Sequence, residues 1–362
     1  MQVQEMPEIR VQRVGQSRIN EVDWDNLIFG RHYSDHMFVA DYRDGQWTDL
    51  RIVPYEKISV YPALIAFHYG QEIFEGLKAY RTVDGKVAIF RPDKNIKRMN
   101  NSARRMAMPE FPFDWFMEAM KKLVSIDKDW VPAGDDVALY IRPFMIATDE
   151  YVGVRPSDTY KLFIITSPVG PYYAKPLNVK VERKYVRAFP GGTGYAKAAG
   201  NYGGAMMPTA LAKEEGFDQL LWTDGIHHEY IEESGTMNVF FIINGTVVTP
   251  PLTGTILPGV TRDSIITLCK DMGIPVEERQ ITVRELFEAY EKGILEDAFG
   301  SGTAVTIHHI VSITDILPNG ERRTIELPSP EKREVSNKLK EVLEGIKRRK
   351  YPDRHGWLVY VD

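Results

Sequence analysis

A single lysine stands in a stretch of small residues in the second half of the chain. The segment from Phe189 to Gly203 reads F-P-G-G-T-G-Y-A-K-A-A-G-N-Y-G, with Lys197 as its only charged residue. A lysine that attacks a carbonyl group must be partly neutral, and small apolar neighbours lower its pKa by excluding water. The glycines would let the backbone approach a ligand closely. Because a mobile surface loop has the same pattern, Lys197 is a candidate nucleophile that needs support from other segments.

Two adjacent carboxylates enter a turn further along the chain. In Y-I-E-E-S-G-T-M-N, Glu232 and Glu233 precede small residues, and an apolar strand follows. A carboxylate at such a turn can form a salt bridge to a heterocyclic nitrogen and keep that nitrogen protonated. A solvated turn is the alternative interpretation.

Two more segments could bind an anion. In T-I-L-P-G-V-T-R, a Pro-Gly turn leads Val260 and Thr261 into the start of a helix, where free backbone N–H groups and the helix dipole attract negative charge. The segment F-G-S-G-T-A, ending at Ala304, offers hydroxyl groups and open backbone at the expected start of a strand. A plain loop with a β-bulge would fit the last segment equally well.

Other kinds of site lack their motifs. The glycines before Lys197 fail G-x-G-x-x-G, because Lys197 stands where the third glycine belongs, and they also fail the P-loop pattern. No G-x-S-x-G is present for a serine hydrolase. With Cys269 as the only cysteine, a cysteine-rich zinc site is excluded, and the adjacent pairs His227-His228 and His308-His309 would point their side chains apart on a strand. We therefore expect no metal site.

The composition predicts a globular protein of two domains. The chain has 362 residues, 43% hydrophobic content and a formal charge of −5, with acidic and basic residues interspersed. Nucleic acid is not implied, because the one basic run, 347–350, is expected to end a helix. No apolar stretch approaches the length of a membrane span, and Glu5 and Glu8 argue against a targeting peptide. We expect a soluble, cytoplasmic protein.

The periodicity of the sequence alternates between strand and helix patterns. Turn signals at Asp44-Gly45, Asp84-Gly85 and Asn244-Gly245 predict three hairpins. We expect the main helices over residues 93–108, 114–126, 205–215, 261–272, 283–292 and 330–350. Because antiparallel strands dominate both halves, the fold class is α+β. A segment rich in proline, 169–177, suggests a connection between a domain at 1–168 and a second domain at 178–362.

Taken together, these segments resemble the branched-chain amino acid aminotransferases, which are pyridoxal-phosphate enzymes of fold type IV. The resemblance covers most of the chain and includes the motifs F-E-G-L-K at Phe74–Lys78, N-I-K-R-M at Asn95–Met99 and Y-I-R-P at Tyr140–Pro143. It implies a smaller N-terminal α/β domain and a larger C-terminal domain with a pseudo-barrel of mostly antiparallel strands. The larger domain would carry the reactive lysine.

The resemblance also implies how pyridoxal 5′-phosphate would be held. Lys197 would be the Schiff-base lysine, Tyr202 would bond to the phenolic oxygen of the cofactor, and Glu233 would pair with the pyridine nitrogen. The phosphate would lie among Arg98, Val260, Thr261 and Thr303. Arg91 competes with Arg98 for that role, but the match to N-I-K-R-M favours Arg98.

The same resemblance implies a pocket for small amino acids and 2-oxo acids. Its residues would be Tyr69, Phe74, Tyr140, Arg142, Thr236 and Ala304. Tyr69 and Arg142 would be supplied or supported across the interface of a homodimer. The reaction would pass the amino group from leucine, isoleucine or valine to 2-oxoglutarate.

One departure and several alternatives remain. The C-x-x-C redox pair of mammalian relatives is replaced here by Val305 and His308, so a thiol switch at that place is not expected. A D-amino acid aminotransferase or an aminodeoxychorismate lyase would share the fold. A catalytically silent relative would be expected to have lost Lys197 or Glu233, and both are present.

Overall fold

The chain folds into two compact units in the computed structural model, which describes residues 5–173 and 175–361. The first unit comprises Met1–Tyr172, Ala196–Gly200 and Ile346–Asp362, and the second comprises Tyr173–Tyr195 and Asn201–Gly345. The boundary after Tyr172 falls inside the connection expected at 169–177, of which Ala174 lies outside the described residues.

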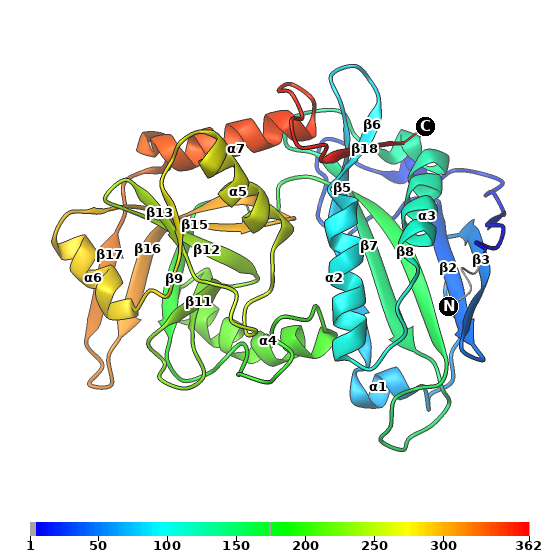
Figure 1. Cartoon of the computed structure of the whole chain (residues 1–362), viewed down its shortest axis with the longest axis horizontal. Helices are drawn as coiled ribbons and strands as arrows, with labels where there is room; N and C mark the ends of the chain where they lie inside the picture. Colours follow the sequence, from blue (N-terminus) through cyan, green and yellow to red (C-terminus); the bar gives the residue numbers. More distant parts are fainter. Residues whose placement is uncertain (1–4, 174, 362) are drawn as a thin grey trace. The chain divides into compact units, whose positions relative to one another are not determined.

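A mixed sheet forms the framework of the first unit (Figure 1). Its strands follow the order β1-β3-β2-β8-β7-β5-β6-β18, and β4 pairs with β7. The strands are β1 (Arg10–Val11), β2 (His36–Arg43), β3 (Gln46–Pro54), β4 (Glu72–Phe74), β5 (Leu77–Arg81), β6 (Val87–Phe90), β7 (Ala138–Ala147), β8 (Tyr160–Val169) and β18 (Leu358–Val361). The predicted hairpins β2–β3 and β5–β6 are confirmed as antiparallel pairs.

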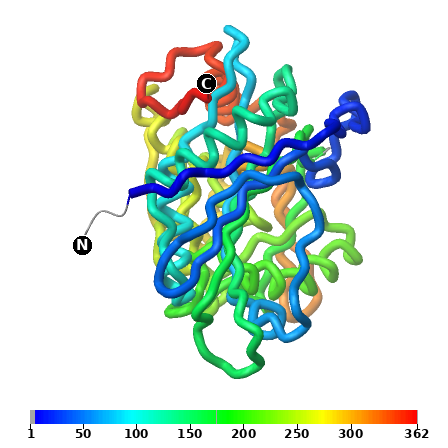
Figure 2. Tube along the Cα trace, turned by 90° about the vertical axis from the view of Figure 1, so that its right-hand side faces the viewer, coloured from blue at the N-terminus to red at the C-terminus, as the bar shows by residue number. Residues whose placement is uncertain are grey.

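Helices cover one face of this sheet (Figure 1). The helical segments are η1 (Ile19–Glu21), α1 (Ile65–Tyr69), α2 (Pro92–Arg105), α3 (Phe113–Ile126) and η2 (Lys128–Trp130). In α2 the apolar residues Ile96, Met99 and Ala103 recur at intervals of three and four and are all buried in the core. Figure 2 shows the N-terminal segment, with β1, running across this unit before the chain enters the hairpin β2–β3.

The second unit is built around a closed barrel of six strands. The ring β9-β10-β11-β12-β15-β16 closes because β11 pairs with both β10 and β12, and four of its six contacts are antiparallel. Its elements are β9 (Leu177–Glu182), β10 (Gln219–Thr223), β11 (Ile231–Ser234), β12 (Met237–Ile243), β13 (Thr246–Thr249), β14 (Val276–Glu278), β15 (Leu295–Gly302), β16 (Thr306–Ile316), β17 (Arg322–Glu326), α5 (Val260–Asp271), α6 (Val283–Glu291) and η3 (Pro330–Lys332). Two further helices, α4 (Ala199–Glu214) and α7 (Glu334–Lys347), lie mostly in this unit. The α+β class expected from the sequence is confirmed.

Two short segments group differently from the domain division expected from the sequence. Residues 196–200 and 346–362 were expected in the C-terminal domain, but their contacts place them in the first unit. Ala198 bridges to Ile73, and β18 pairs along the whole length of β6. With these segments, the first unit is the larger of the two.

Three helix limits also differ from the expected ones. Helix α4 begins at Ala199 rather than at residue 205, in spite of its glycines, because the side chain of Asn201 in its first turn is bonded to both the hydroxyl and the carbonyl of Thr193. Helix α3 begins after Pro112, so the expected N-cap, Asp114, lies in its first turn. The final helix is split into η3 and α7, and the side chain of Ser329 makes no capping bond.

None of the helices in the described part of the chain combines the length and the apolar character that a bilayer crossing requires.

Candidate functional site

Both backbone groups of Lys197 are bonded within the first unit. Its N–H donates to the hydroxyl of Ser102 on α2 at 2.9 Å, and its carbonyl accepts the N–H of Phe74 at 3.0 Å. The side-chain nitrogen lies 4.6 Å from the centre of the Phe74 ring. Lys197 is half-buried. The alternative of a mobile surface loop therefore does not fit these contacts, and the lysine stands at a defined place just before α4.

Three of the residues expected in the substrate pocket form a chain of contacts that begins at this lysine. The guanidinium of Arg142 is 4.7 Å from the ring of Phe74, on which Lys197 also rests. The same guanidinium donates to the hydroxyl of Tyr140 at 2.8 Å. Tyr140 and Arg142 share one face of β7, because side chains alternate along a strand. Phe74 thus contacts both Lys197 and Arg142, and Arg142 contacts Tyr140.

Gly76 leaves the space in which the Tyr140 hydroxyl lies. A Cβ atom at Gly76 would be 2.2 Å from that hydroxyl oxygen, which no side chain could tolerate. The glycine of the F-E-G-L-K motif is therefore explained by packing against Tyr140.

Arg98 is held by the carboxylate of Glu75. Glu75 belongs to the F-E-G-L-K motif, but no role was expected for it. The Nε and Nη2 atoms of Arg98 donate to the two oxygens of Glu75 at 2.7 and 2.8 Å, and both residues are buried. Asn95 donates to the same carboxylate at 2.8 Å. Burial alone would raise the pKa of Glu75, but the charges of Arg98 and Lys197 and the hydrogen bonds hold that pKa below its usual value. Glu75 therefore fixes the guanidinium of Arg98.

The competing arginine, Arg91, lies in a different environment. Its guanidinium stacks over the ring of Trp357 at 4.8 Å. The backbone N–H of Arg91 donates to the backbone carbonyl of the same tryptophan. Arg91 thus contacts the C-terminal segment of the chain, whereas the charge of Arg98 acts on the same carboxylate as that of Lys197.

Tyr69 lies outside the cluster around Lys197. It ends α1, is 43% exposed, and donates its hydroxyl to the carbonyl of Val152. Its ring contact is with His68. Within the described residues, none of its hydrogen bonds or ring contacts reaches Phe74, Tyr140 or Arg142.

Tyr202 lies in the first turn of α4, half-buried, five residues after Lys197. Among the glycines of this helix, a Cβ at Gly200, Gly203 or Gly204 would meet nothing within 4 Å. Gly194 differs, because a Cβ there would lie 2.4 Å from the carbonyl oxygen of Thr255. Close packing against the chain itself therefore explains Gly194.

In the second unit, Glu233 is fixed where the barrel closes. It is 3% exposed and pairs with Trp222 on one side and Asn238 on the other. One oxygen accepts the N–H of Leu257 at 2.7 Å, and the other forms an ion pair with Arg187 at 3.2 Å. Arg187 also donates to the carbonyls of Gly194 and Thr255. Arg187 therefore contacts the carboxylate of Glu233, Gly194 in the segment before Lys197, and Thr255 in the loop before α5.

The neighbouring carboxylate, Glu232, has a different environment. It is buried, one oxygen accepts the hydroxyl of Thr255, and the other has no hydrogen-bond partner among the described residues. Burial raises the pKa of Glu232, although Thr255 and Arg187 oppose the rise. Glu233, by contrast, has an ion-pair partner for one oxygen and a hydrogen-bond donor for the other.

The remaining predicted residues lie at one end of the barrel. Thr236 is exposed in the turn between β11 and β12, and Thr303 and Ala304 lie in the turn between β15 and β16. The two turns are neighbours, because Asn238 near the start of β12 pairs with Ser301 near the end of β15. Strand β16 begins at Thr306, so Ala304 lies in the turn before it. The strand was expected to begin at residue 304.

The start of α5 is suited to bind an anion. Val260 and Thr261 are its first residues, and no capping side chain accepts their N–H groups. Loop 255–259, which leads into the helix, contacts Glu233 through Leu257. Nearby on the barrel, the hydroxyls of Ser234 and Ser301 are buried without a hydrogen-bond partner among the described residues. A carboxylate, uncapped amide groups and unpaired hydroxyls fit a cofactor that has a ring nitrogen at one end and a phosphate at the other.

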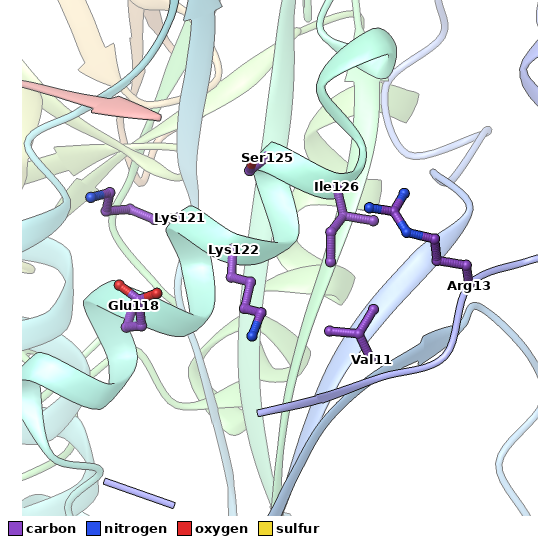
Figure 3. A pocket seen from close by; sticks show the side chains of 7 residues that line it. All are labelled: Val11, Arg13, Glu118, Lys121, Lys122, Ser125 and Ile126. Atoms are coloured by element: carbon purple, nitrogen blue, oxygen red, sulfur yellow. The ribbon is translucent and has the colours of Figure 1, made fainter. Parts of the chain in front are cut away.

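No alternative site for chemistry stands out. No group of three metal-ligating side chains occurs among residues 5–173 and 175–361. His308 contacts the carbonyl of Lys175, whereas His309 contacts Ser336, so the two side chains diverge. One pocket, of about 580 Å³, lies between the N-terminal segment and α3 (Figure 3). It is lined by Val11, Arg13, Glu118, Lys121, Lys122, Ser125 and Ile126, and it includes none of the predicted residues.

Comparison with known proteins shows the family to which the chain belongs. Residues 72–313 match the family described as Amino-transferase class IV. The chain is 47% identical, over 94% of its length and 93% of the relative's, to branched-chain-amino-acid aminotransferase 2 of Bacillus subtilis. Among solved structures, the branched-chain amino acid aminotransferase from Escherichia coli matches with a TM-score of 0.72 at 26% identity, covering 91% of this chain and 99% of that one.

A second solved structure carries a ligand. This branched-chain amino acid aminotransferase, from the organism abbreviated T.th., is complexed with N-(5′-phosphopyridoxyl)-L-glutamate. It matches with a TM-score of 0.70 at 26% identity, and the match covers 89% of this chain and 98% of that one. The fold, the extent of the match and the identity to curated relatives agree. The chain therefore belongs to the branched-chain-amino-acid aminotransferases of the class IV aminotransferase family.

Proposed function

We propose that the protein uses pyridoxal 5′-phosphate to transfer the amino group of L-leucine, L-isoleucine or L-valine to 2-oxoglutarate, which yields branched 2-oxo acids and L-glutamate. The observation that carries the proposal is the position of Lys197, whose backbone is bonded on both sides and whose nitrogen rests on Phe74 next to Arg142. Family membership supports the reaction class.

Each cofactor-binding residue has a separate task in this proposal. When bound, pyridoxal phosphate supplies an electron sink for the electron pair released at the substrate's α-carbon. Glu233, paired with Arg187, would bind the ring nitrogen, and Tyr202 would bind the phenolic oxygen. Arg98, the N–H groups of Val260 and Thr261, and the hydroxyl of Thr303 would hold the phosphate.

Lys197 moves the proton in the chemical step. As a free amine it would take the proton from the α-carbon of the substrate as general base, and as general acid it would then give a proton to C4′ of the cofactor. The contact with Phe74 keeps its nitrogen on one side of the pocket. The same residue thus serves both half-reactions.

The substrate needs an apolar wall and a positive charge. Phe74 and Tyr140 supply the wall for the branched side chain, and Arg142 supplies the charge for a carboxylate. Thr236 and Ala304 contribute from the two turns at the end of the barrel. A pocket with apolar walls and one guanidinium suits both a branched side chain and the second carboxylate of glutamate.

The proposal includes a homodimer. Around α1 the first unit exposes Tyr61, Phe67, Tyr69, Val152 and Val154, with Val154 85% exposed. The two segments that carry them are joined by hydrogen bonds, Tyr151 N–H to Ala63 and Tyr69 hydroxyl to Val152. An apolar surface of this kind is typical of a protein interface, and Tyr69 would reach a substrate pocket across it. The cytoplasmic location stays a prediction.

Substitution of Lys197 tests the function directly. Lys197→Ala is expected to abolish turnover of L-leucine with 2-oxoglutarate and the visible absorbance of the bound cofactor. Lys180→Ala is a matched control, because Lys180 forms an ion pair with Glu215 and has no role in the proposed site. An active Lys197→Ala protein would refute the proposal. Parallel assays with D-alanine and aminodeoxychorismate separate this reaction from those of the other fold-type-IV enzymes.

A further inference from the structure

The peptide groups around Leu257 are held from both sides by two strands of the barrel. The N–H of Leu257 donates to Glu233 on β11 at 2.7 Å. Its carbonyl accepts the side-chain amide of Asn238 on β12 at 2.9 Å. Glu233 and Asn238 are direct partners in the β11–β12 pair. Two neighbouring side chains therefore set the position of loop 255–259.

Asn238 also explains the glycine at the end of this loop. A Cβ atom on Gly259 would lie 2.0 Å from the side-chain oxygen of Asn238. The backbone angles of Gly259, φ −67° and ψ 132°, are open to any residue. Gly259 is thus required by the space that Asn238 occupies, and it is the N-cap of α5.

We propose that Asn238 is a positioning residue that fixes, through loop 255–259, the spacing between the Glu233 carboxylate and the first N–H groups of α5. This inference rests on the proposed function, in which Glu233 takes the ring nitrogen and α5 takes the phosphate. Asn238 holds loop 255–259, which contacts Glu233 and leads into α5. No contact between Asn238 and the ligand is proposed.

The spacing matters because the cofactor is one rigid molecule with two anchored ends. Once one end is bound, the other meets its site at a high effective concentration, provided that the two sites are correctly spaced. A displaced loop leaves each site usable by itself but removes this advantage. Loss of Asn238 should therefore weaken binding of the whole cofactor more than binding of its parts.

The first experiment compares three probes on the full chain, freed of cofactor and then titrated. Asn238→Ala is expected to weaken the binding of pyridoxal 5′-phosphate about 10-fold or more, and to change the binding of pyridoxal and of inorganic phosphate less than about 2-fold. Asn178→Ala is the matched control, because Asn178 is an asparagine on strand β9 of the same barrel that bonds to Asp218 and Ser312. The control should bind all three probes as the wild type does.

The second experiment uses Gly259. Gly259→Ala alone should weaken pyridoxal 5′-phosphate binding, because the new methyl group displaces Asn238. In an Asn238→Ala background the same change should cost less, because the obstructing oxygen is gone. This double-variant comparison keeps the inference testable even if one single variant is poorly folded, which thermal unfolding of each variant would show.

Several outcomes would refute the positioning role of Asn238 and leave the proposed function unaffected. Unchanged affinity of Asn238→Ala for pyridoxal 5′-phosphate would do so, as would an equal loss for inorganic phosphate alone, which would mean that Asn238 only shapes the start of α5. Fully additive effects of the two substitutions would also contradict it. Failure of the wild-type chain to bind pyridoxal 5′-phosphate would refute the proposed function instead.

Discussion

Each unit of the protein contains a buried pair of one carboxylate and one guanidinium, and the two pairs are built differently. In the first unit, Glu75 binds Arg98 through two parallel hydrogen bonds. In the second unit, Arg187 and Glu233 form a single ion pair at 3.2 Å, and the same carboxylate accepts the N–H of Leu257. In the proposed function, the cofactor is bound by Arg98 of the first pair and by Glu233 of the second pair.

The difference between the pairs follows from what each charged group can do when its partner is lost. An arginine stays protonated in proteins, so a buried guanidinium without its carboxylate must keep its charge. A glutamate can take up a proton and become neutral. The first pair should therefore be the more costly one to break, and the second should show its loss mainly in the dependence of activity on pH.

The largest effect is expected for Glu75→Gln. The substitution leaves the buried guanidinium of Arg98 without its carboxylate and should lower the free energy of unfolding by about 3–5 kcal/mol at neutral pH. The pKa of Glu75 is lowered in the folded protein, so its stabilisation is present above the unfolded value of about 4.3 and is lost as the pH falls through the folded value. Urea unfolding at neutral and at acidic pH measures both effects.

The control for this variant is an exposed pair in the same unit. Glu110 lies 2.6 Å from Arg104, and both side chains are about half exposed, so Glu110→Gln should cost less than about 1 kcal/mol. If Glu75→Gln cost no more than Glu110→Gln, the carboxylate of Glu75 would not be what holds Arg98.

A smaller loss of stability, about 2 kcal/mol, is expected for Arg187→Met. Leu257 still donates to Glu233, and the carboxylate can become neutral by taking up a proton. Because the proposed function needs an ionised Glu233, kcat should fall at neutral pH and recover in part as the pH is raised. Arg187→Lys keeps a positive charge and should retain more of the activity at neutral pH. A pH profile of Arg187→Met with the shape of the wild-type profile would contradict the role given to this ion pair.

Short-range patterns carried much of the fold prediction. The Asp-Gly turns at residues 44 and 84 predicted the hairpins β2–β3 and β5–β6, since turn residues specify their own backbone conformation. The helix expected from residue 283 is confirmed as α6, and Thr282 caps it by accepting the N–H of Glu285. Local preferences do not state which distant strands meet. The barrel was therefore expected only from the family resemblance, and neither the strand pairs that close it nor the return of β18 to β6 were predicted.

The candidate site shows the same limit. Phe74, Tyr140, Arg142 and Lys197 were named from motifs, and a chain of contacts runs from Lys197 through Phe74 and Arg142 to Tyr140. Glu75 lies inside one of these motifs, but its role depends on a partner 23 residues away. Arg187 follows the end of β9 at Glu182 and belongs to none of the quoted motifs, and only the folded chain brings it to Glu233. Residues that act by holding another residue have no spacing signal of their own.

The smallest expected change in the free energy of unfolding is that of Glu232→Gln, and its sign is opposite to that of Glu75→Gln. The pKa of Glu232 is raised by burial, so its favourable contribution is present below the unfolded value of about 4.3 and is lost as the pH rises through the folded value. At neutral pH, Glu232→Gln removes a buried charge and should raise the free energy of unfolding by less than about 1 kcal/mol, whereas at about pH 4 the gain should shrink. Glu233→Gln, which leaves Arg187 without its carboxylate, should destabilise the same strand at neutral pH. If both variants lost stability there, the two neighbouring glutamates would both be paired charges, and burial would not be the dominant influence on Glu232.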